Sequence, residues 1–393
     1  MNSNSMDNAL VWATENGAIP GLVAMAATGG EVIYQSAFGK RDLSKNTPMT
    51  IDSVFWIASM TKAVTAAAAM QLVDQNKLQL DTPIGEVLPD LAAPQVLEGF
   101  DESGAPKLRP AKRPITLRML LTHTAGFCYD MWNGDMVSYL EKTGTPGIIS
   151  CQNAALTTPI VSDPGTRWEY GTNIDFVGKA IEAVSGDTLR AYLRDNILLP
   201  LDMGDTDFRI GTAQRERLVG MHTRGQDGLM APIAFELEQS PEFEMGGGGL
   251  YSTAVDYIKF TQMILNKGSC NGHQLLKPDT VAMMGQNQIG DMEVRKLVSA
   301  VAFATNDVDF YPGMSKKWGF SFMINTATTP EGRSAGSLAW AGLANTYYWI
   351  DPVRDISGVV LMQLLPFADT ECLNTYAAFE RSVYSQLKGR KPS

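Results

Sequence analysis

The sequence predicts an α+β protein, in which one mixed domain built from both ends of the chain is interrupted by a mainly helical segment. Runs rich in Val, Ile, Tyr, Trp and Phe, which favour strands, lie near the two ends, within residues 21–38 and 318–364. Residues from about 80 to 240 show helical patterns instead. The 393 residues, 45% of them hydrophobic, suffice for two domains or for one domain with a large insertion.

The first 80 residues are expected to form a helix, a hairpin and a second helix. A helical pattern covers residues 6–17. Apolar runs at 21–27 and 31–38 flank a Thr-Gly-Gly sequence that is typical of a hairpin turn. A short apolar run, 54–58, then leads into an Ala-rich helix.

The middle of the chain combines helices with polar connections. Helices are expected at 116–122, 175–184 and 188–197. Residues 96–113 and 127–165 are interpreted as loop-rich, because charged residues, Gly and Pro interrupt any periodic pattern there.

The last third of the chain returns to strands. A run of four glycines, residues 246–249, precedes a predicted helix over 254–266 and would let the backbone approach its neighbours closely. No Lys-Ser/Thr pair follows the run as a phosphate-binding loop requires. Beyond it we expect three strands and a closing helix, at 318–326, 337–350, 356–364 and 369–388.

Ser59 lies where the apolar run meets the Ala-rich helix, and Lys62 follows three residues later. A serine at this position is an ordinary helix cap. A lysine in the first turn is unusual, because the positive end of the helix dipole lies there. The two side chains share a helix face. The dipole and burial lower the pKa of an ammonium, and an amine that is neutral near pH 7 can take a proton from serine.

Two other serine patterns are weaker. A second S-x-x-K, at Ser385 and Lys388, lies in a polar tail and is expected at the surface. The one G-x-S-x-G string, around Ser334, lacks the preceding strand and following helix of a nucleophile elbow, so it is expected in a surface loop.

The histidines do not suggest a Ser-His-Asp triad. His222 and His273 lie in polar, loop-like segments and are expected at the surface. His123 ends a helix next to small residues, where a structural hydrogen bond is the better interpretation.

Tyr170, which precedes a glycine, could simply anchor a loop on the core. Beside a lysine, its phenol would have a lowered pKa and offer a second base. Trp340-Ala341-Gly342-Leu343 is interpreted as strand, with a core tryptophan. Alternatively, Gly342 lets a substrate carbonyl lie against the strand edge, where the N–H groups of Leu343 and Ser59 would bind an oxyanion.

Together, Ser59-Met60-Thr61-Lys62, Tyr170-Gly171-Thr172 and Trp340-Ala341-Gly342 occur in the order and spacing of family VIII carboxylesterases, which the chain resembles over nearly its whole length. These serine hydrolases are similar to class C β-lactamases and DD-peptidases. Other stretches that resemble the family are residues 120–126, 163–165 and 247–252. Residues 96–101 and 168–175 also resemble the lovastatin-pathway acyltransferase, a relative with the same nucleophile arrangement.

The resemblance implies a β-lactamase/DD-peptidase-like fold, with an antiparallel sheet flanked by helices and a mainly helical insertion domain. We expect residues 1–79 and 245–393 to form the α/β domain and residues 80–244 the helical one, with the active site between them.

Two departures from the β-lactamase pattern bear on the substrate. Those enzymes have Tyr-x-Asn, whereas Thr172 occupies the third position here and Asn173 follows it. They also have Lys-Thr-Gly in place of Trp340-Ala341-Gly342. Loss of a charge-assisted contact costs ~1.5–3 kcal/mol, which favours neutral esters over anionic β-lactams and leaves weak β-lactam hydrolysis open. We expect Trp340, Ala341, Gly342 and Asn173 to bind substrate.

The resemblance implies ester hydrolysis through an acyl-enzyme. Lys62 and Tyr170 together accept the Ser59 proton, and Ser59 attacks the ester carbonyl. The oxyanion binds to the N–H groups of Ser59 and Leu343, Tyr170 protonates the leaving alkoxide, and water releases the acid. Either Lys62 or Tyr170 could be the resting base. No metal or organic cofactor is implied.

Three alternatives remain. An acyltransferase would pass the same acyl group to an alcohol or amine. A β-lactamase or peptidase is disfavoured by Trp340, and a non-catalytic binding protein by the presence of Ser59, Lys62 and Tyr170 together. Five side chains are candidates to line the acyl and alcohol pockets: Phe127, Tyr129, Met131, Trp132 and Phe310.

Composition narrows the partners. The formal charge is −10 and no dense Lys/Arg cluster occurs, so nucleic acid and anionic membranes are unexpected partners. Four scattered cysteines suggest neither a zinc site nor a disulfide framework. With no leader or membrane span in the sequence, we expect a cytoplasmic protein that acts on a small-molecule ester; the oligomeric state stays open.

Overall fold

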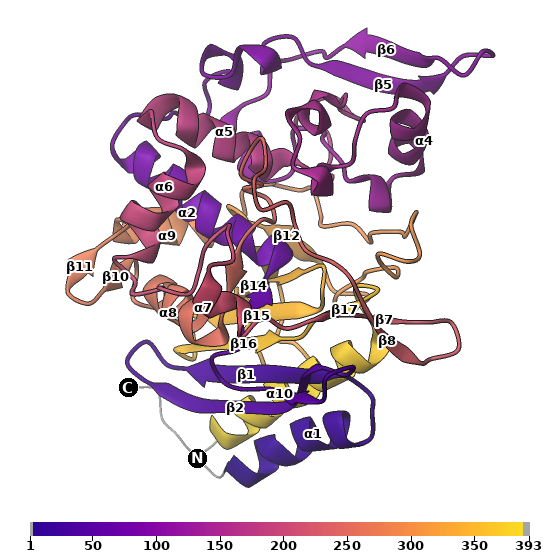
Figure 1. Ribbon diagram of the computed structural model, residues 1–393. Coiled ribbons are helices and arrows are strands. Elements are labelled where there is room, and N and C mark those ends of the chain that lie inside the picture. The colour runs from indigo at the N-terminus through magenta and orange to yellow at the C-terminus, as the bar shows by residue number, and fades with distance from the viewer. Residues whose placement is uncertain (1–2, 388–393) are drawn as a thin grey trace.

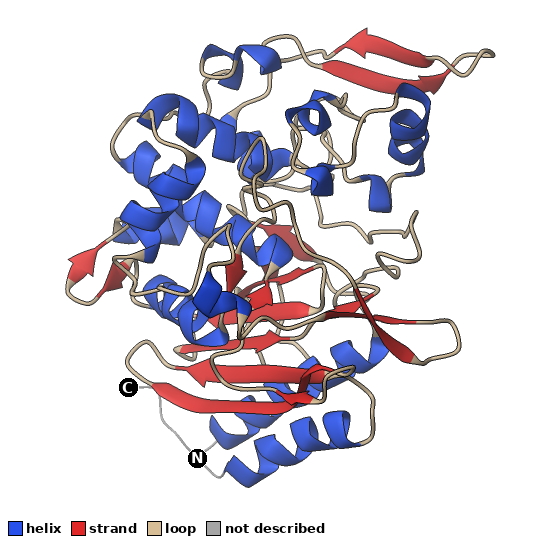
Figure 2. Ribbon diagram, in the orientation of Figure 1, coloured by secondary structure: helices blue, strands red, loops and turns tan. Residues whose placement is uncertain are grey.

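Residues 3–387 are described in a computed structural model (Figures 1 and 2). Its centre is an eight-stranded sheet in the order β12-β13-β14-β15-β16-β1-β2-β3, in which every neighbouring pair is antiparallel. The strands are β1 (Gly21–Ala27), β2 (Val32–Asp42), β3 (Thr47–Pro48), β12 (Lys316–Trp318), β13 (Met323–Asn325), β14 (Leu338–Gly342), β15 (Thr346–Asp351) and β16 (Ile356–Leu361). The two ends of the chain meet in this sheet, since β1 pairs with β16.

Helices cover both faces of the sheet. α1 (Ser3–Glu15) and α10 (Thr370–Leu387) pack together on one face, below β1 and β2 in Figure 1. α8 (Ala254–Leu265) packs on β16, β1 and β15. The alternation of side chains along β15 separates the faces: the ring of Trp349 contacts Phe379 of α10, and that of Tyr348 contacts Tyr257 of α8.

A mostly helical layer lies above the sheet in Figure 1. Its helices are α3 (Leu117–Leu121), α4 (Gly134–Thr143), α5 (Asn173–Ser185) and α6 (Leu189–Leu193), whereas α7 (Thr212–Arg215) lies lower, beside α8, in Figure 1. α2 (Thr61–Asp74) connects this layer to the sheet and contacts α5 and α6. Because α2 is buried on all sides along its first three turns, its small alanines let neighbours pack closely around it.

The remaining elements are short. Additional strands are β4 (Phe55–Trp56), β5 (Gln95–Phe100), β6 (Pro106–Pro110), β7 (Met221–Arg224), β8 (Met230–Ile233), β9 (Tyr251–Ser252), β10 (Ser269–Cys270), β11 (His273–Gln274) and β17 (Leu364–Leu365), and one more helix is α9 (Pro278–Met284).

The predicted fold class is confirmed, and several local predictions are wrong. Residues 96–113, expected as a loop, contain the β5–β6 hairpin, where Val96 and Leu97 are buried and the turn residues hide the alternation. The single strand expected over 337–350 is the β14–β15 hairpin, which turns at Asn345 with a φ of 60°. α4 lies in a region expected to be loop-rich. The proposed division into residues 1–79 with 245–393, and 80–244, stays a prediction.

Over residues 3–387, no helix is both long and apolar enough to cross a bilayer. The same residues contain no group of three or more His, Cys, Asp or Glu side chains placed to hold a metal ion. The predicted cytoplasmic location stays a prediction.

Candidate active site

Ser59 lies in a 3₁₀ turn, η1 (Ala58–Met60), between β4 and the first turn of α2. Its side chain is partly exposed. Ala58, directly before it, has a φ of +44°, a left-handed conformation that costs an alanine about 1–2 kcal/mol. The backbone at this turn is therefore held in place by its surroundings.

Gly342 is part of what holds the turn. A Cβ at this position would lie 2.3 Å from the carbonyl oxygen of Ile57, two residues before Ser59. The hydroxyl of Thr346 donates to the same carbonyl at 3.3 Å. Gly342 therefore lets β14 pack directly against the turn that carries Ser59.

Lys62 is fully buried, and its amine contacts three oxygen atoms. The Nζ atom donates to Ser59 Oγ at 2.9 Å, to Tyr129 Oη at 3.0 Å and to the Gly247 carbonyl at 2.6 Å. The predicted meeting of Lys62 and Ser59 on one helix face is thus present, at a distance suited to direct proton transfer.

Burial lowers the pKa of Lys62 to about 7. The negative charge of Asp175 has the opposite, smaller effect and raises this pKa. The direction agrees with the prediction. Within residues 3–387, no carboxylate oxygen comes within 4 Å of the amine. Lys62 is therefore an amine that can be neutral, and act as a base, close to pH 7.

Tyr170 lies next to both residues. Its Oη accepts a hydrogen bond from the Trp340 indole at 2.8 Å, and Lys62 Nζ lies 4.8 Å from the centre of its ring. Burial raises the pKa of Tyr170 and outweighs its hydrogen bonds with Ser59 and Trp340, which lower it. The predicted lowering of the Tyr170 pKa is therefore wrong in direction, because the low dielectric around the ring disfavours the anion more than its neighbours favour it.

Tyr129 is a second phenol in the site, and the sequence analysis placed it only in the substrate pocket. In addition to its contact with Lys62, its backbone N–H donates to the Tyr170 carbonyl at 3.1 Å. Burial raises its pKa, so it too stays protonated. No local pattern marks Tyr129 in the sequence, because its partner Lys62 lies 67 residues away.

The two expected oxyanion donors are both free. In the described part of the chain, neither the N–H of Ser59 nor that of Leu343 has a hydrogen-bond acceptor. Both residues line the same pocket. Two unpaired N–H groups beside the candidate nucleophile suit an oxyanion.

The pocket at Ser59 is narrow, with a free volume of about 30 Å³. Its wall is mainly apolar, and it includes three of the five side chains expected there. The lining residues are Trp56, Ala58, Ser59, Tyr129, Met131, Trp132, Ile148, Ile149, Met245, Gly247, Gly248 and Leu343.

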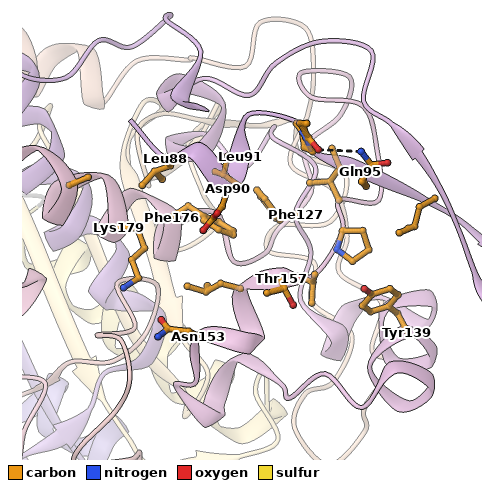
Figure 3. Close-up of a pocket in the computed structure, with 18 of the residues that line it drawn as sticks. Leu88, Asp90, Leu91, Gln95, Phe127, Tyr139, Asn153, Thr157, Phe176 and Lys179 are labelled. Carbon is orange, nitrogen blue, oxygen red and sulfur yellow. Dashed lines mark hydrogen bonds between the residues drawn. The ribbon is translucent and has the colours of Figure 1, made fainter. Parts of the chain in front are cut away.

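A much larger cavity, of about 850 Å³, lies within the helical layer (Figure 3). Phe127, expected to line the substrate pocket, lines this cavity instead, and its ring stacks on that of Phe176 with a centroid distance of 4.4 Å. None of Ser59, Lys62 and Tyr170 borders it. Ser59 lines the narrow pocket, and Tyr170 borders a third cavity, of about 180 Å³.

Asn173 does not reach the pocket. Its side chain is fully buried, and its amide donates to the Phe127 carbonyl at 3.3 Å and lies 3.0 Å from His123 Nδ1. It joins the loops that carry Tyr129 and Tyr170, so the expected contact of this amide with substrate is absent from the structure. His123 has the hydrogen-bonding role that the sequence suggested.

Trp340 and its neighbour Ala341 are almost fully buried. The Trp340 ring packs edge-on against Trp318 with a centroid distance of 4.6 Å, and its single donor is used by Tyr170. Trp340 therefore orients the phenol, a role that the sequence did not predict.

His222 and Ser334 were both expected at the surface, and the structure places the two residues in different environments. His222 is fully buried, against expectation, and its Nε2 accepts from the Leu43 N–H at 3.3 Å, because β7 pairs with β17 inside the fold. Ser334 lies in a turn, as expected, with its N–H bonded to Asp351. Lys388 lies outside the described residues.

Residues 6–382 match the family described as Beta-lactamase. The chain belongs to this family. It is 31% identical to ML-236A carboxylate methylbutanoyltransferase mlcH of Penicillium citrinum, over 98% of this chain and 95% of the relative. It is 28% identical to lovastatin esterase of Penicillium rubens, over 98% of this chain and 99% of the relative.

Solved structures share this fold over nearly the whole chain. A mutant of simvastatin synthase from Aspergillus terreus superposes with a TM-score of 0.83 at 30% identity, covering 98% of this chain and 99% of that one. EstCE1, described as a hydrolase with promiscuous acyltransferase activity, shares the fold with a TM-score of 0.76 at 23% identity, covering 97% and 98% of the two chains. The protein is thus a β-lactamase-fold member of a family of acyl-transferring serine enzymes.

Proposed function

We propose that the protein is a serine carboxylesterase that hydrolyses short- to medium-chain neutral esters through an acyl-enzyme on Ser59. One observation carries the proposal: the fully buried amine of Lys62 lies 2.9 Å from the Ser59 hydroxyl. Burial lowers the pKa of this amine to about 7. This is the arrangement that makes a serine nucleophilic without a histidine.

In the proposed mechanism, neutral Lys62 takes the hydroxyl proton as Ser59 attacks the ester carbonyl. The oxyanion binds to the N–H groups of Ser59 and Leu343. Tyr170, which stays protonated and accepts a hydrogen bond from the Trp340 indole, gives its proton to the leaving alkoxide and regains one from Lys62. Water then attacks the acyl-enzyme and gives its proton to Lys62; the bond from Ser59 to the acyl group breaks, Ser59 takes that proton back, and the acid leaves. Each group used is a side chain or N–H of the chain itself.

The pocket supports a neutral substrate. None of its lining residues is charged, and most are apolar. An anionic substrate would lose its hydration there without gaining an opposite charge at the wall. We therefore expect slow or no turnover of nitrocefin, a chromogenic β-lactam, beside clear turnover of a p-nitrophenyl ester.

An acyltransferase is the second candidate. It is favoured by mlcH, which is named as a methylbutanoyltransferase and aligns along nearly the whole chain. The lovastatin esterase aligns over the same length and supports hydrolysis instead. The two activities share the acyl-enzyme and differ in the acceptor. An ester product that forms only when an alcohol acceptor is added, at the expense of free acid, would assign transferase activity.

A panel of p-nitrophenyl esters of increasing chain length, with mass detection of the acylated peptide that contains Ser59, tests the proposal. Ser59→Ala is expected to abolish turnover and acylation, whereas Ser334→Ala keeps both. Wild-type rates in Ser59→Ala would refute the assignment. Failure of a fluorophosphonate probe to label Ser59 in folded protein would favour a non-catalytic binding protein.

A further inference from the structure

Asp175, in the first turn of α5, is a carboxylate with almost no compensation. It is fully buried, and its Oδ1 accepts one hydrogen bond, from the Gly247 N–H at 2.8 Å. Its Oδ2 is buried without a hydrogen-bond partner among the described residues. A buried carboxylate normally has several hydrogen bonds or an opposite charge in contact, so the charge of Asp175 calls for a partner.

The backbone of Gly247 joins Asp175 to Lys62. The N–H of this glycine binds the carboxylate, and its carbonyl accepts the Lys62 amine at 2.6 Å. A Cβ on Gly247 would lie 2.7 Å from Asp175 Oδ2, so a larger residue would push the two apart. Gly247 thus contacts the Asp175 carboxylate through its N–H and the Lys62 amine through its carbonyl.

The other titratable groups around this pair are neutral. Burial, with the charge of Lys62, lowers the pKa of His123, and burial raises the pKa values of Tyr129 and Tyr170. One turn further along α5, Lys179 is paired with Glu182 at 3.0 Å. Glu169, near Tyr170, is paired with Arg167 at 2.8 Å. Burial raises the pKa of Asp175 to about 6, and the charge of Lys62 acts against this, so the ionisation of Asp175 and that of Lys62 depend on each other.

We propose that Asp175 is the counter-charge of Lys62, held through Gly247, and that it sets the pH at which the amine becomes a base. Asp175 touches neither Ser59 nor the pocket, so it is a positioning residue. Its effect follows from opposing influences: burial favours the neutral amine, and the carboxylate favours the ammonium. The inference rests on the proposed function only in giving Lys62 the part of base.

Asp175→Asn is the decisive variant, because the amide oxygen can still accept from Gly247 while the charge is lost. The titration of Lys62 is followed by NMR of lysine labelled with ¹³C at Cε, with the signal assigned by its loss in Lys62→Arg. The pKa of Lys62 is expected to fall by about one to two pH units in Asp175→Asn. An unchanged pKa would overturn the proposal.

Asp256→Asn is the matched control. Asp256 is also a buried aspartate at a helix start, and it accepts from the Asp205 N–H and from Thr206. Its replacement removes a buried charge whose contacts are with Asp205, Thr206 and Lys259, and the pKa of Lys62 is expected to stay unchanged. An equal change in both variants would mean that loosening of the fold, and not the Asp175 charge, moves the amine.

Kinetics then connect the titration to the reaction. The acid limb of kcat/KM for a p-nitrophenyl ester is expected to move to lower pH in Asp175→Asn by the same amount as the NMR titration. Full activity in Ser59→Ala would refute the proposed function. The NMR titration of Lys62 does not depend on activity, so it tests the role of Asp175 separately. If Asp175→Asn does not fold, the wild-type Lys62 signal should show a second, smaller inflection where Asp175 titrates. Its absence would refute the coupling.

Discussion

Replacing Trp340 by phenylalanine tests whether the hydrogen bond to Tyr170 contributes to catalysis. The indole N–H donates to Tyr170 Oη at 2.8 Å, inside the protein. A buried hydrogen bond of this kind is worth about 1 kcal/mol net, which corresponds to about a fivefold fall in kcat/KM. The loss should be greatest when Tyr170 must donate a proton to a poor leaving group. Ethyl esters are therefore expected to suffer more than p-nitrophenyl esters, whose leaving group departs without a proton.

Trp318→Phe is the control for this prediction. Trp318 packs against Trp340, is equally buried, and its indole nitrogen has no hydrogen-bond partner among the described residues. Its replacement leaves a similar cavity but removes no bond. Both variants should lose comparable thermal stability, measured by calorimetry, and only Trp340→Phe should lose activity on alkyl esters. Equal kinetic losses in the two would refute the reasoning, because packing alone would then explain the effect.

Further predictions concern the base and the turn. Because Lys62 must be neutral to accept a proton and its pKa is about 7, kcat/KM is expected to fall about tenfold per pH unit below pH 7; an acid limb near pH 4.5 would point to a carboxylate base. Tyr129→Phe removes one of three acceptors from the ammonium and should move this limb to lower pH, and an unmoved limb would contradict that contact. Gly342→Ala should destabilise the fold by about 1–3 kcal/mol through its clash with Ile57, measured by thermal unfolding. Gly134→Ala, which meets no atom within 4 Å, should be nearly neutral, and equal effects would exclude the clash as the cause.

The catalytic turn shows how far local pattern reaches. Ser59 and Lys62 are three residues apart on a strongly helical segment, so their contact could be predicted from helix geometry alone. The same holds for the β1–β2 hairpin and for α8, whose signals are contained in a few consecutive residues. The β5–β6 hairpin was missed because its turn chemistry concealed a short alternation.

The electrostatics of the site could not be predicted in this way. From sequence, a lysine near Tyr170 suggested a lowered phenol pKa, whereas burial reverses the direction. Burial depends on what packs around a side chain, and that is a property of the assembled molecule. Asn173 was misplaced for the same reason, because only the packing of α5 turns its amide towards His123.

By itself, the sequence determined the α+β class and the spacing that sets an amine beside a serine, since both arise from interactions between residues close along the chain. Only the tertiary structure brought the Gly247 carbonyl, 185 residues from Lys62, to this amine, and the Asp175 carboxylate to the N–H of the same glycine. These contacts follow from how α2, α5 and the glycine run pack together. The basicity of Lys62 is therefore a consequence of the fold.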